Sequence, residues 1–328
     1  MTKLTRLLKY KWFQVGSFGL LLALLPLMVT SRYYLNVMIF IGIHTLLVVG
    51  LNLLMGYAGQ ISLGHAAFFG LGAYTSGILS ATYQVSPWPA MVAAVAVTVA
   101  VALVVGVPTL KLTGYYLAMA TLGFGIIVYI CFKELVWLTG GPSGLVGIPV
   151  LSIGGITLDE PGTYYYLVWG ATLAAIAISL NIVDSRVGRA LRAIHDSEAA
   201  ARASGISTAK LKIWVFVISA VYASVAGSLY AHFITFISPS SFDFMFSIKL
   251  VTMVVVGGMA SIWGAVFGAA TLTVLPELLT AFHDYDIVLF GLILMVVMIF
   301  LPQGLTRGAL DAWEKYRYQR QKGLILNG

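Results

Sequence analysis

The sequence predicts an all-α polytopic membrane protein with about ten transmembrane helices. Of its 328 residues, 60% are hydrophobic and only 9% are charged, whereas a soluble domain carries about 25% charged residues. So little charge cannot cover a surface in contact with water, and a disordered chain would be more polar and poorer in aromatic residues. The apolar runs are of helix length and lack the two-residue alternation of barrel strands, so a helical bundle is expected.

Each predicted span is an apolar run that is long enough to cross the hydrocarbon core as a helix. The first run follows four basic residues and resembles a signal peptide, but no small-x-small cleavage site follows it, which favours a retained helix. The stretch 247–280 is too long for one span, and a tight turn is expected where Gly257 to Ser261 interrupt it. The predicted spans are 15–30, 35–55, 60–82, 89–108, 115–132, 164–183, 213–234, 248–260, 262–280 and 286–302.

The basic residues predict the orientation of the bundle. Ten spans place both termini on one side, and all but three of the 19 Lys and Arg residues then lie in segments on that side. This is the distribution that the positive-inside rule requires of cytoplasmic segments, and it disfavours nucleic-acid binding. Those segments are 1–14, 56–59, 109–114, 184–212, the turn near 261, and 303–328.

The ten spans also divide into five plus five. An odd-numbered repeat inverts when it is duplicated, which is a common transporter plan. A possible inverted repeat is therefore expected to relate spans 2–5 to spans 7–10, although no sequence match between the halves supports it.

The internal loop 184–212 is long and strongly charged, with six Lys and Arg residues. Its alanine-rich part, 187–203, predicts a helix that stops at Gly205. Helical spacing places Leu191, Ile194 and Glu198 on one face. Such a charged helix cannot span a membrane, so it lies on the lipid surface, docks to a soluble partner, or serves as a solvated connector.

The same loop resembles the ATPase-docking EAA loop of ABC importer permeases. Glu198, Ala199 and Ala200 are followed by Gly205, one position later than in the commonest form of that motif. Longer stretches are similar to the branched-chain amino acid ABC transporter permease family, in particular its LivM-type subunit. The resemblance covers about 50–305 and rests on GRALRAIHDSEAAARASGI (188–206), GYAGQISLGHAAF (56–68), GYYLAMATL (114–122), TGGPSGLVGIP (139–149) and LVTMVVVGGMASIWGAVFG (250–268).

The resemblance implies a type II-like ABC importer permease in a bacterial inner membrane, with both termini cytoplasmic. Residues 1–328 would form a single transmembrane domain, with 184–212 as coupling loop and 303–328 as a basic tail. The implied partners are a homologous LivH-like permease, two ABC ATPase subunits, a periplasmic substrate-binding protein and membrane lipid. The implied ATPase-coupling residues are Arg189, Arg192, Asp196, Glu198, Ala199, Ala200 and Gly205.

A second segment, 56–77, is rich in glycine and polar residues for a membrane span. Its glycines permit close helix packing or a break in the helix, where free backbone groups could meet a polar substrate. Polar side chains at membrane depth usually face the bundle interior or a water-filled path. Candidates for the translocation path are Gln60, Ser62, Gly64, His65 and, on the preceding span, Asn52; interhelical packing explains the same residues.

The chain contains no Gly-Lys dipeptide and therefore no phosphate-binding P-loop. We expect a non-catalytic subunit that binds no metal or cofactor, with ATP and Mg on the partner ATPases. Urea, short amides and other small carboxylates are alternative substrates to branched-chain amino acids. An ATP-independent secondary transporter or channel is the alternative class, but proton coupling would normally require acidic groups deep in the membrane.

Overall fold

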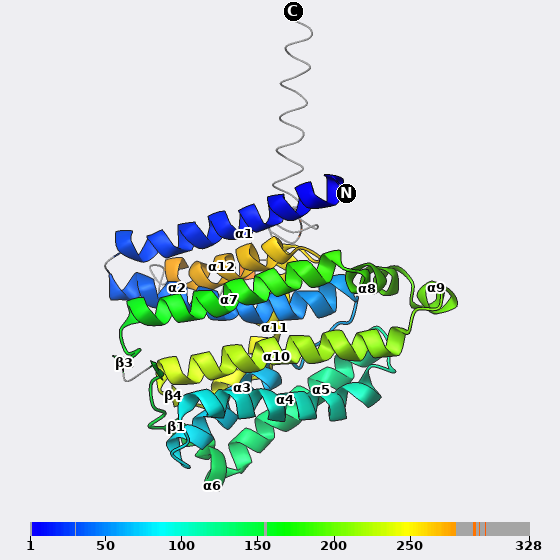
Figure 1. Cartoon of the computed structure of the whole chain (residues 1–328). Helices are drawn as coiled ribbons and strands as arrows, with labels where there is room; N and C mark the ends of the chain where they lie inside the picture. Colours follow the sequence, from blue (N-terminus) through cyan, green and yellow to red (C-terminus); the bar gives the residue numbers. More distant parts are fainter. Residues whose placement is uncertain are drawn as a thin grey trace, which may run out of the picture.

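The computed structural model describes residues 2–29, 31–153 and 156–279, together with positions 291, 292, 295 and 299. The predicted tenth span, 286–302, falls outside the described residues except at those four positions, and the basic tail 303–328 lies outside them altogether. The described part is a bundle of long helices that lie side by side, with short helices and strands at its two ends (Figure 1). The all-helical expectation is therefore confirmed for the bundle.

The first half of the chain forms five long helices. Proline stands in the first turn of α4, where its missing amide costs no hydrogen bond. One five-residue π-helical turn, Leu53–Tyr57, continues α2 without a break. The helices are α1 (Thr2–Met28), α2 (Arg32–Asn52), α3 (His65–Ala81), α4 (Pro87–Thr109) and α5 (Tyr115–Glu134).

A compact cap joins the two halves at one end of the bundle. It holds α6 (Val136–Thr139) and a 3-10 turn, Gly141–Ser143. Strand β1 (Leu145–Val146) pairs antiparallel with the distant β4 (Phe236–Ile237), with Leu145 opposite Ile237. Strands β2 (Ser152–Ile153) and β3 (Ile156–Thr157) form a second small hairpin.

The second half begins with α7 (Pro161–Asp184), which leads to two short helices at the opposite end of the bundle (Figure 1). The chain then returns through α10, passes a 3-10 turn, and ends its described part with two more helices. These elements are α8 (Arg186–Asp196), α9 (Glu198–Ala203), α10 (Thr208–Ile234), the 3-10 turn Pro239–Phe242, α11 (Phe244–Gly257) and α12 (Ile262–Leu279).

Within the described residues, seven helical segments are long and apolar enough to cross a membrane. Helix α3 falls just short at 17 residues, and the apolar part of α1 covers only Trp12–Met28. The predicted total of ten spans therefore stays a prediction. The seven segments are Arg32–Tyr57, Pro87–Thr109, Tyr115–Glu134, Pro161–Asp184, Thr208–Ile234, Pro239–Gly257 and Ile262–Leu279.

Two predicted boundaries were wrong and one turn is confirmed. The predicted span 60–82 becomes helical only at His65, because Gly59 at φ +67° ends the preceding helical turn and the chain stays non-helical to Gly64. The predicted helix 187–203 is interrupted at Ser197, whose backbone is extended (φ −161°, ψ 109°). The expected turn follows Gly257, where Gly258 and Ala260 adopt positive φ.

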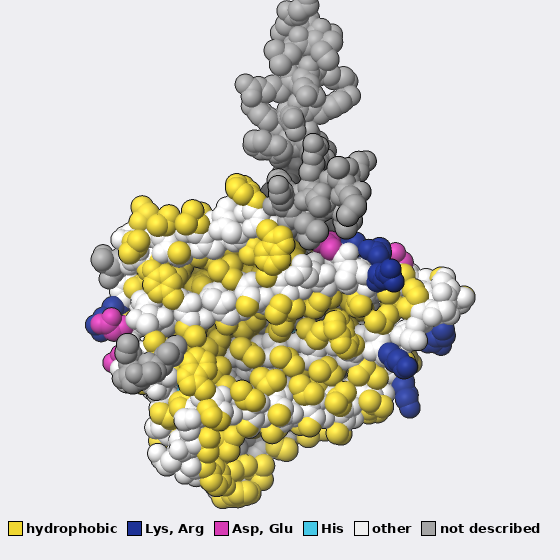
Figure 2. All heavy atoms as spheres, in the orientation of Figure 1, with side chains coloured by type: hydrophobic (Ala, Val, Ile, Leu, Met, Phe, Trp, Pro, Cys, Tyr) yellow, Lys and Arg dark blue, Asp and Glu magenta, His cyan; other side chains and the backbone are white. Residues whose placement is uncertain are grey.

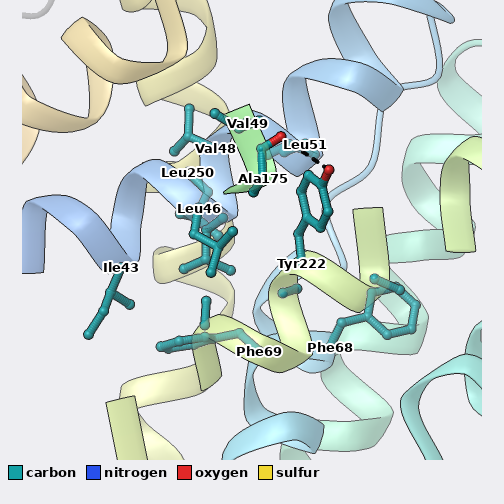
Figure 3. Packing of buried hydrophobic residues seen from close by; sticks show 14 of the residues in the cluster. Ile43, Leu46, Val48, Val49, Leu51, Phe68, Phe69, Ala175, Tyr222 and Leu250 are labelled. Carbon is teal, nitrogen blue, oxygen red and sulfur yellow. Dashed lines mark hydrogen bonds between the residues drawn. The ribbon is translucent and has the colours of Figure 1, made fainter. Parts of the chain in front are cut away.

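The core lies around α2 and α10. Leu46, Leu51 and their neighbours on α2 are almost completely buried, and they pack with Phe68 and Phe69 of α3 and Leu250 of α11 (Figure 3). Tyr222 of α10 donates a hydrogen bond to the Ala175 carbonyl of α7 at 3.2 Å (Figure 3). A helix that is apolar all round belongs in the interior of a bundle.

Helices α3 and α10 run parallel and in unusually close contact. A Cβ added at Gly72 would lie 2.3 Å from the Ser224 carbonyl oxygen, and one at Gly227 would lie 2.0 Å from that of Phe69. His65 pairs with Ser219, and Ser76 pairs with His232. The glycines of 56–77 thus serve close packing in this part of the bundle.

The surface divides into an apolar middle and polar ends. Figure 2 shows Lys and Arg side chains gathered at the end where α8 and α9 lie, and a broad hydrophobic surface between the two ends. This is the surface expected of a protein surrounded by lipid along its sides.

Candidate functional site

The segment between α7 and α10 forms a two-helix corner at the basic end of the bundle. Ser185 caps α8 by accepting hydrogen bonds from the amides of Val187 and Gly188 at 3.1 and 3.4 Å. Ser197 caps α9 by accepting from the Ala200 amide at 3.3 Å. Serine is a favoured residue at both positions because its hydroxyl satisfies an amide that the helix leaves free.

Apolar contacts hold this corner against the bundle. Leu191 and Ile194 are 0% and 3% exposed, and Ala201 of α9 is 3% exposed. The shared face predicted for Leu191 and Ile194 is confirmed, whereas Glu198 begins a separate helix. Gly205, at φ +80°, ends α9, and the Ile206 amide reaches back to the Ala201 carbonyl at 3.1 Å, as in a glycine-stopped helix.

Glu198 lies at the centre of a polar cluster between α9 and α10. One carboxylate oxygen accepts from Arg202 at 2.8 Å and from the Thr208 hydroxyl at 3.3 Å, and the other accepts from Lys212 at 3.1 Å. The Lys212 side chain is only 2% exposed. Burial by itself raises the pKa of Glu198, but the bonds to Lys212, its charge, Arg202 and Thr208 together hold that pKa below its ordinary value.

The remaining candidates for ATPase coupling lie on the outside of the corner. Arg189 is exposed and donates to the Asp184 carbonyl at 3.3 Å. Arg192 donates to the Val183 carbonyl at 3.3 Å and lies 5.5 Å from the ring centre of Tyr57. The corner thus presents a polar surface that a partner could contact; its exposed residues include Asp196, Ala199, Ala200 and Arg202.

A cavity of about 370 Å³ adjoins this cluster, between the ends of α4 and α10 and helix α9. Its lining includes Glu198 with its partners Arg202 and Lys212, together with Lys111 and apolar residues of α4 and α10.

The second candidate region is the non-helical segment 58–64, which links the π-helical turn to α3. Gln60 and Ser62 are 7% and 2% exposed, and His65 is completely buried. Gln60 donates to the Ala58 carbonyl at 2.9 Å, and His65 bonds Ser219 at 2.9 Å. Gly64 permits contact with α5, since a Cβ there would lie 2.5 Å from the Thr121 carbonyl oxygen.

Asn52 is placed away from this segment. It is completely buried, and its amide nitrogen donates to the Ser261 carbonyl at 2.7 Å. Its carbonyl oxygen accepts from the Ala260 amide at 3.0 Å. His44, on the same side of α2, bonds Thr273 of α12 at 2.7 Å. Both side chains therefore tie α2 to α12 and the turn before it.

The two candidate regions touch each other. Arg192 of α8 lies over Tyr57, and a Cβ at Gly59 would lie 3.0 Å from the imidazole Nδ1 of His195. A movement of α8 would therefore displace Tyr57 and Gly59, at the start of the non-helical segment. The sequence pattern did not single out Tyr57 or His195, because each contacts a residue more than 130 positions away, and no local periodicity links residues so far apart.

Sequence reasoning also missed the side chains that support the non-helical segment and the start of α3. Thr121 of α5 accepts from the Leu63 amide at 3.0 Å, and Ser247 of α11 accepts from the Ala66 amide at 3.1 Å. Ser and Thr in apolar helices commonly bond to neighbouring helices, so their presence alone does not identify a partner. Among the described residues, no three His, Cys, Asp or Glu side chains come together as a metal-binding group.

Comparison with known proteins gives one family match over most of the chain. Residues 33–302 match the family described as branched-chain amino acid transport system / permease component. The chain is 33% identical over 303 residues to the high-affinity branched-chain amino acid transport system permease protein LivM of Salmonella typhimurium, covering 85% of this chain and 71% of that protein.

Two further relatives come from Escherichia coli. The chain is 32% identical over 320 residues to the LivM permease protein of that organism, covering 90% of this chain and 75% of the relative. It is 28% identical over 285 residues to the LivH permease protein, covering 80% of this chain and 90% of the relative. No solved structure matches the chain.

Proposed function

This chain belongs to the branched-chain amino acid transport system permease family, and from that premise we propose that it is one of two permease subunits of an ATP-driven importer. It forms the translocation path together with a homologous LivH-like permease. Two ABC ATPase subunits bind ATP and Mg and drive transport, and a periplasmic protein delivers the substrate. The observation that carries the proposal is the family match over residues 33–302, which includes every described long helix except α1.

The substrate is a branched-chain amino acid, which is the class that the names of the LivM and LivH relatives print. Urea, short amides and small carboxylates are the alternative substrates within the same importer class. The chain itself is not an enzyme in this proposal.

The α8–α9 corner is the ATPase-coupling element. Its exposed polar face is free for a partner, while the cluster of Glu198 and Lys212 fastens α9 to the start of α10. A displacement of α9 is thereby transmitted to α10 through the Glu198–Lys212 ion pair. A displacement of α8 is transmitted to the segment 58–64 through the contacts of Tyr57 and His195.

Ten spans in two inverted halves remain our proposal for the architecture. The pattern of neighbours supports it: α3 and α4 pack against each other and against α10, while α11 and α12 pack against each other and against α2. Exchanging α2 with α10, α3 with α11 and α4 with α12 reproduces this pattern. Each half also has a long helix followed by a non-helical segment and a shorter helix.

The membrane is the bacterial inner membrane, with both termini and the α8–α9 corner cytoplasmic. The clustering of Lys and Arg at the end that carries α8 and α9 supports this orientation (Figure 2).

The test is ATP-dependent uptake of leucine by the complete importer in proteoliposomes. Glu198→Arg places a second cation beside the buried Lys212, so we expect α9 to detach, with less ATPase co-purifying and less transport while membrane insertion stays normal. Glu160→Arg, an acidic residue at the opposite end of the bundle, is the matched control and should transport normally.

Two results would contradict the proposal. Normal transport and normal ATPase yield with Glu198→Arg would remove the coupling role of the corner. Leucine transport by this chain alone, without the ATPases, would instead establish an ATP-independent transporter.

A further inference from the structure

The non-helical segment 58–64 reaches the middle of the bundle. It starts at the π-helical turn, beside α8, and ends at His65, which bonds Ser219 near the midpoint of the 27-residue α10. Helix α10 is about 40 Å long at 1.5 Å per residue, so His65 lies beside a point roughly 17 Å from the start of α10 and roughly 23 Å from its end. Backbone that is not helical is tolerated at such depth only where protein buries it or where it lines a cavity.

Several polar groups of this segment have no hydrogen-bond partner among the described residues. They include three side-chain atoms that are buried from solvent: Gln60 Oε1, Ser62 Oγ and His65 Nδ1. Within the described part of the chain, no backbone hydrogen bond is made by the amides of Ile61 and Ser62 or by the carbonyls of Gln60, Ile61 and Ser62. An unsatisfied polar group away from water costs about 1–3 kcal/mol, so a cluster of them indicates a ligand, water or a partner chain.

The other side of the segment is apolar and open. Ile61 is 43% exposed, although it is flanked by the buried Gln60 and Ser62. Next to it, a narrow crevice runs between the starts of α3 and α11 and the middle of α5, and its lining includes Leu63, Leu122, Ile126 and Phe244. Asp243, which caps α11 through the Phe246 amide at 2.8 Å, also lines the crevice.

We propose that residues 59–64 hold the ammonium and carboxylate of an aliphatic amino acid during its passage, with its side chain against Ile61, the exposed apolar side chain of the segment. This inference rests on the proposed importer function and names the substrate-binding element within it. The free groups include both donors and acceptors, as a zwitterion requires, and the segment itself has no charged side chain. Asp243, the one charged residue in the crevice lining, favours a substrate that carries an ammonium group.

The geometry also links this site to the coupling corner. At the start of the segment, Tyr57 contacts Arg192 of α8 and Gly59 contacts His195 of α8. A movement of α8 that shifts Gly59 would change the spacing of the carbonyls and amides two to four residues further on. Substrate would then be released without any change in the chemistry of the site.

Cysteine accessibility in the complete importer tests the proposal. The sequence has one cysteine, Cys131, so Cys131→Ser provides a cysteine-free background. Ser62→Cys and Ile61→Cys are then treated with the cationic thiol reagent methanethiosulfonate ethyltrimethylammonium during ATP hydrolysis, with and without leucine and the binding protein. Ser76→Cys is the matched control, because Ser76 is as buried as Ser62 on the same stretch of chain but is paired with His232.

We expect both test cysteines to react during turnover, and Ser76→Cys to stay unreactive. With leucine about tenfold above half-saturation, the labelling rate should fall by roughly a factor of ten, since the fraction of empty sites falls by that factor. Urea at the same concentration should give no protection.

Three outcomes would overturn the proposal. Cysteines that stay unreactive while transport is intact would show that a partner chain packs on the segment. Reactive cysteines that leucine does not protect would show a water-filled path without substrate contact. Protection of the cysteines by urea but not by leucine would show that the segment binds urea or a short amide and not an amino acid. Failure of the unmodified importer to transport leucine would instead defeat the underlying function, and the two failures are therefore distinguishable.

Discussion

At the scale of single residues, Glu198 holds α9 on α10 through a lysine that is almost completely buried. The folded-state pKa of Glu198 is lower than its unfolded value, so the pair stabilises the corner above the unfolded pKa of about 4.3. That stabilisation is lost as the pH falls through the lowered folded value. We predict that backbone amides of α9 keep their protection from hydrogen exchange at neutral pH and lose it only below about pH 4.3.

Glu198→Gln is the control for this prediction, because it keeps the shape of the side chain and removes its titration. Its α9 amides should exchange faster than those of the native protein at pH 7, with no further change on acidification. Native α9 amides that lose protection above pH 6 would exclude Glu198 as the group responsible.

Asn52 and Thr45 lie on the same completely buried stretch of α2 but have opposite hydrogen-bonding states. Asn52 bonds the backbone of Ala260 and Ser261, whereas the Thr45 hydroxyl has no partner among the described residues. Asn52→Leu should destabilise the protein by about 1–3 kcal/mol, since it leaves two partly buried backbone groups unpaired. Thr45→Val removes an unpaired hydroxyl and should be neutral or stabilising. Thermal unfolding of the purified variants checks both, and equal losses would contradict this account.

At the scale of helices, the sequence predicts where apolar segments lie better than where they break. Gly257 to Ser261 form a recognisable turn because glycines interrupt a long apolar run. The break at Ser197 falls inside an alanine-rich stretch, and it exists because the Ser197 hydroxyl caps a new helix whose first residue, Glu198, reaches Lys212. That contact joins residues 14 positions apart across a turn, and no local pattern contains it.

The start of α3 at His65, later than predicted, also depends on contacts between residues far apart in the sequence. The polar residues from Gln60 to His65 were identifiable as candidates from composition alone. Their conformation depends on Thr121 and Ser247, which accept the Leu63 and Ala66 amides from two other helices. The candidate coupling residues were chosen from a sequence motif, and the inward orientation of Glu198 follows only from its buried partner on α10.

The contact of α3 with α10 makes a prediction about helix packing. Gly227→Ala would place a Cβ 2.0 Å from the Phe69 carbonyl oxygen, and backbone on both helices must move apart to admit it. We expect a loss of about 1–3 kcal/mol, measured as a lower unfolding temperature. Gly170→Ala is the matched control: Gly170 lies within α7 and a Cβ there would meet nothing within 4 Å. That variant should be unchanged or slightly more stable, because alanine favours the helix.

At the scale of the whole molecule, the distribution of Lys and Arg residues and the proposed inverted repeat both predict how the helices are oriented across the membrane. In the proposed repeat, the segment between α2 and α3 corresponds to the segment between α10 and α11. These two segments lie at opposite ends of the bundle. Such an arrangement requires α2 and α10 to run in opposite directions, and Figure 1 shows them doing so. The lysines and arginines around α8 and α9 then decide which end is cytoplasmic.

Single cysteines in the Cys131→Ser background test this topology in cells whose outer membrane has been removed. Asp159 and Lys210 are both exposed and lie at opposite ends of the bundle. In the proposed orientation the basic end faces the cytoplasm, so Asp159→Cys should react with an impermeant maleimide on intact cells, and Lys210→Cys only after lysis. A cysteine appended after Gly328 should also require lysis if the chain crosses the membrane an even number of times. Labelling of that last cysteine on intact cells, with Lys210→Cys still protected, would rule out ten spans and with them the two equal halves.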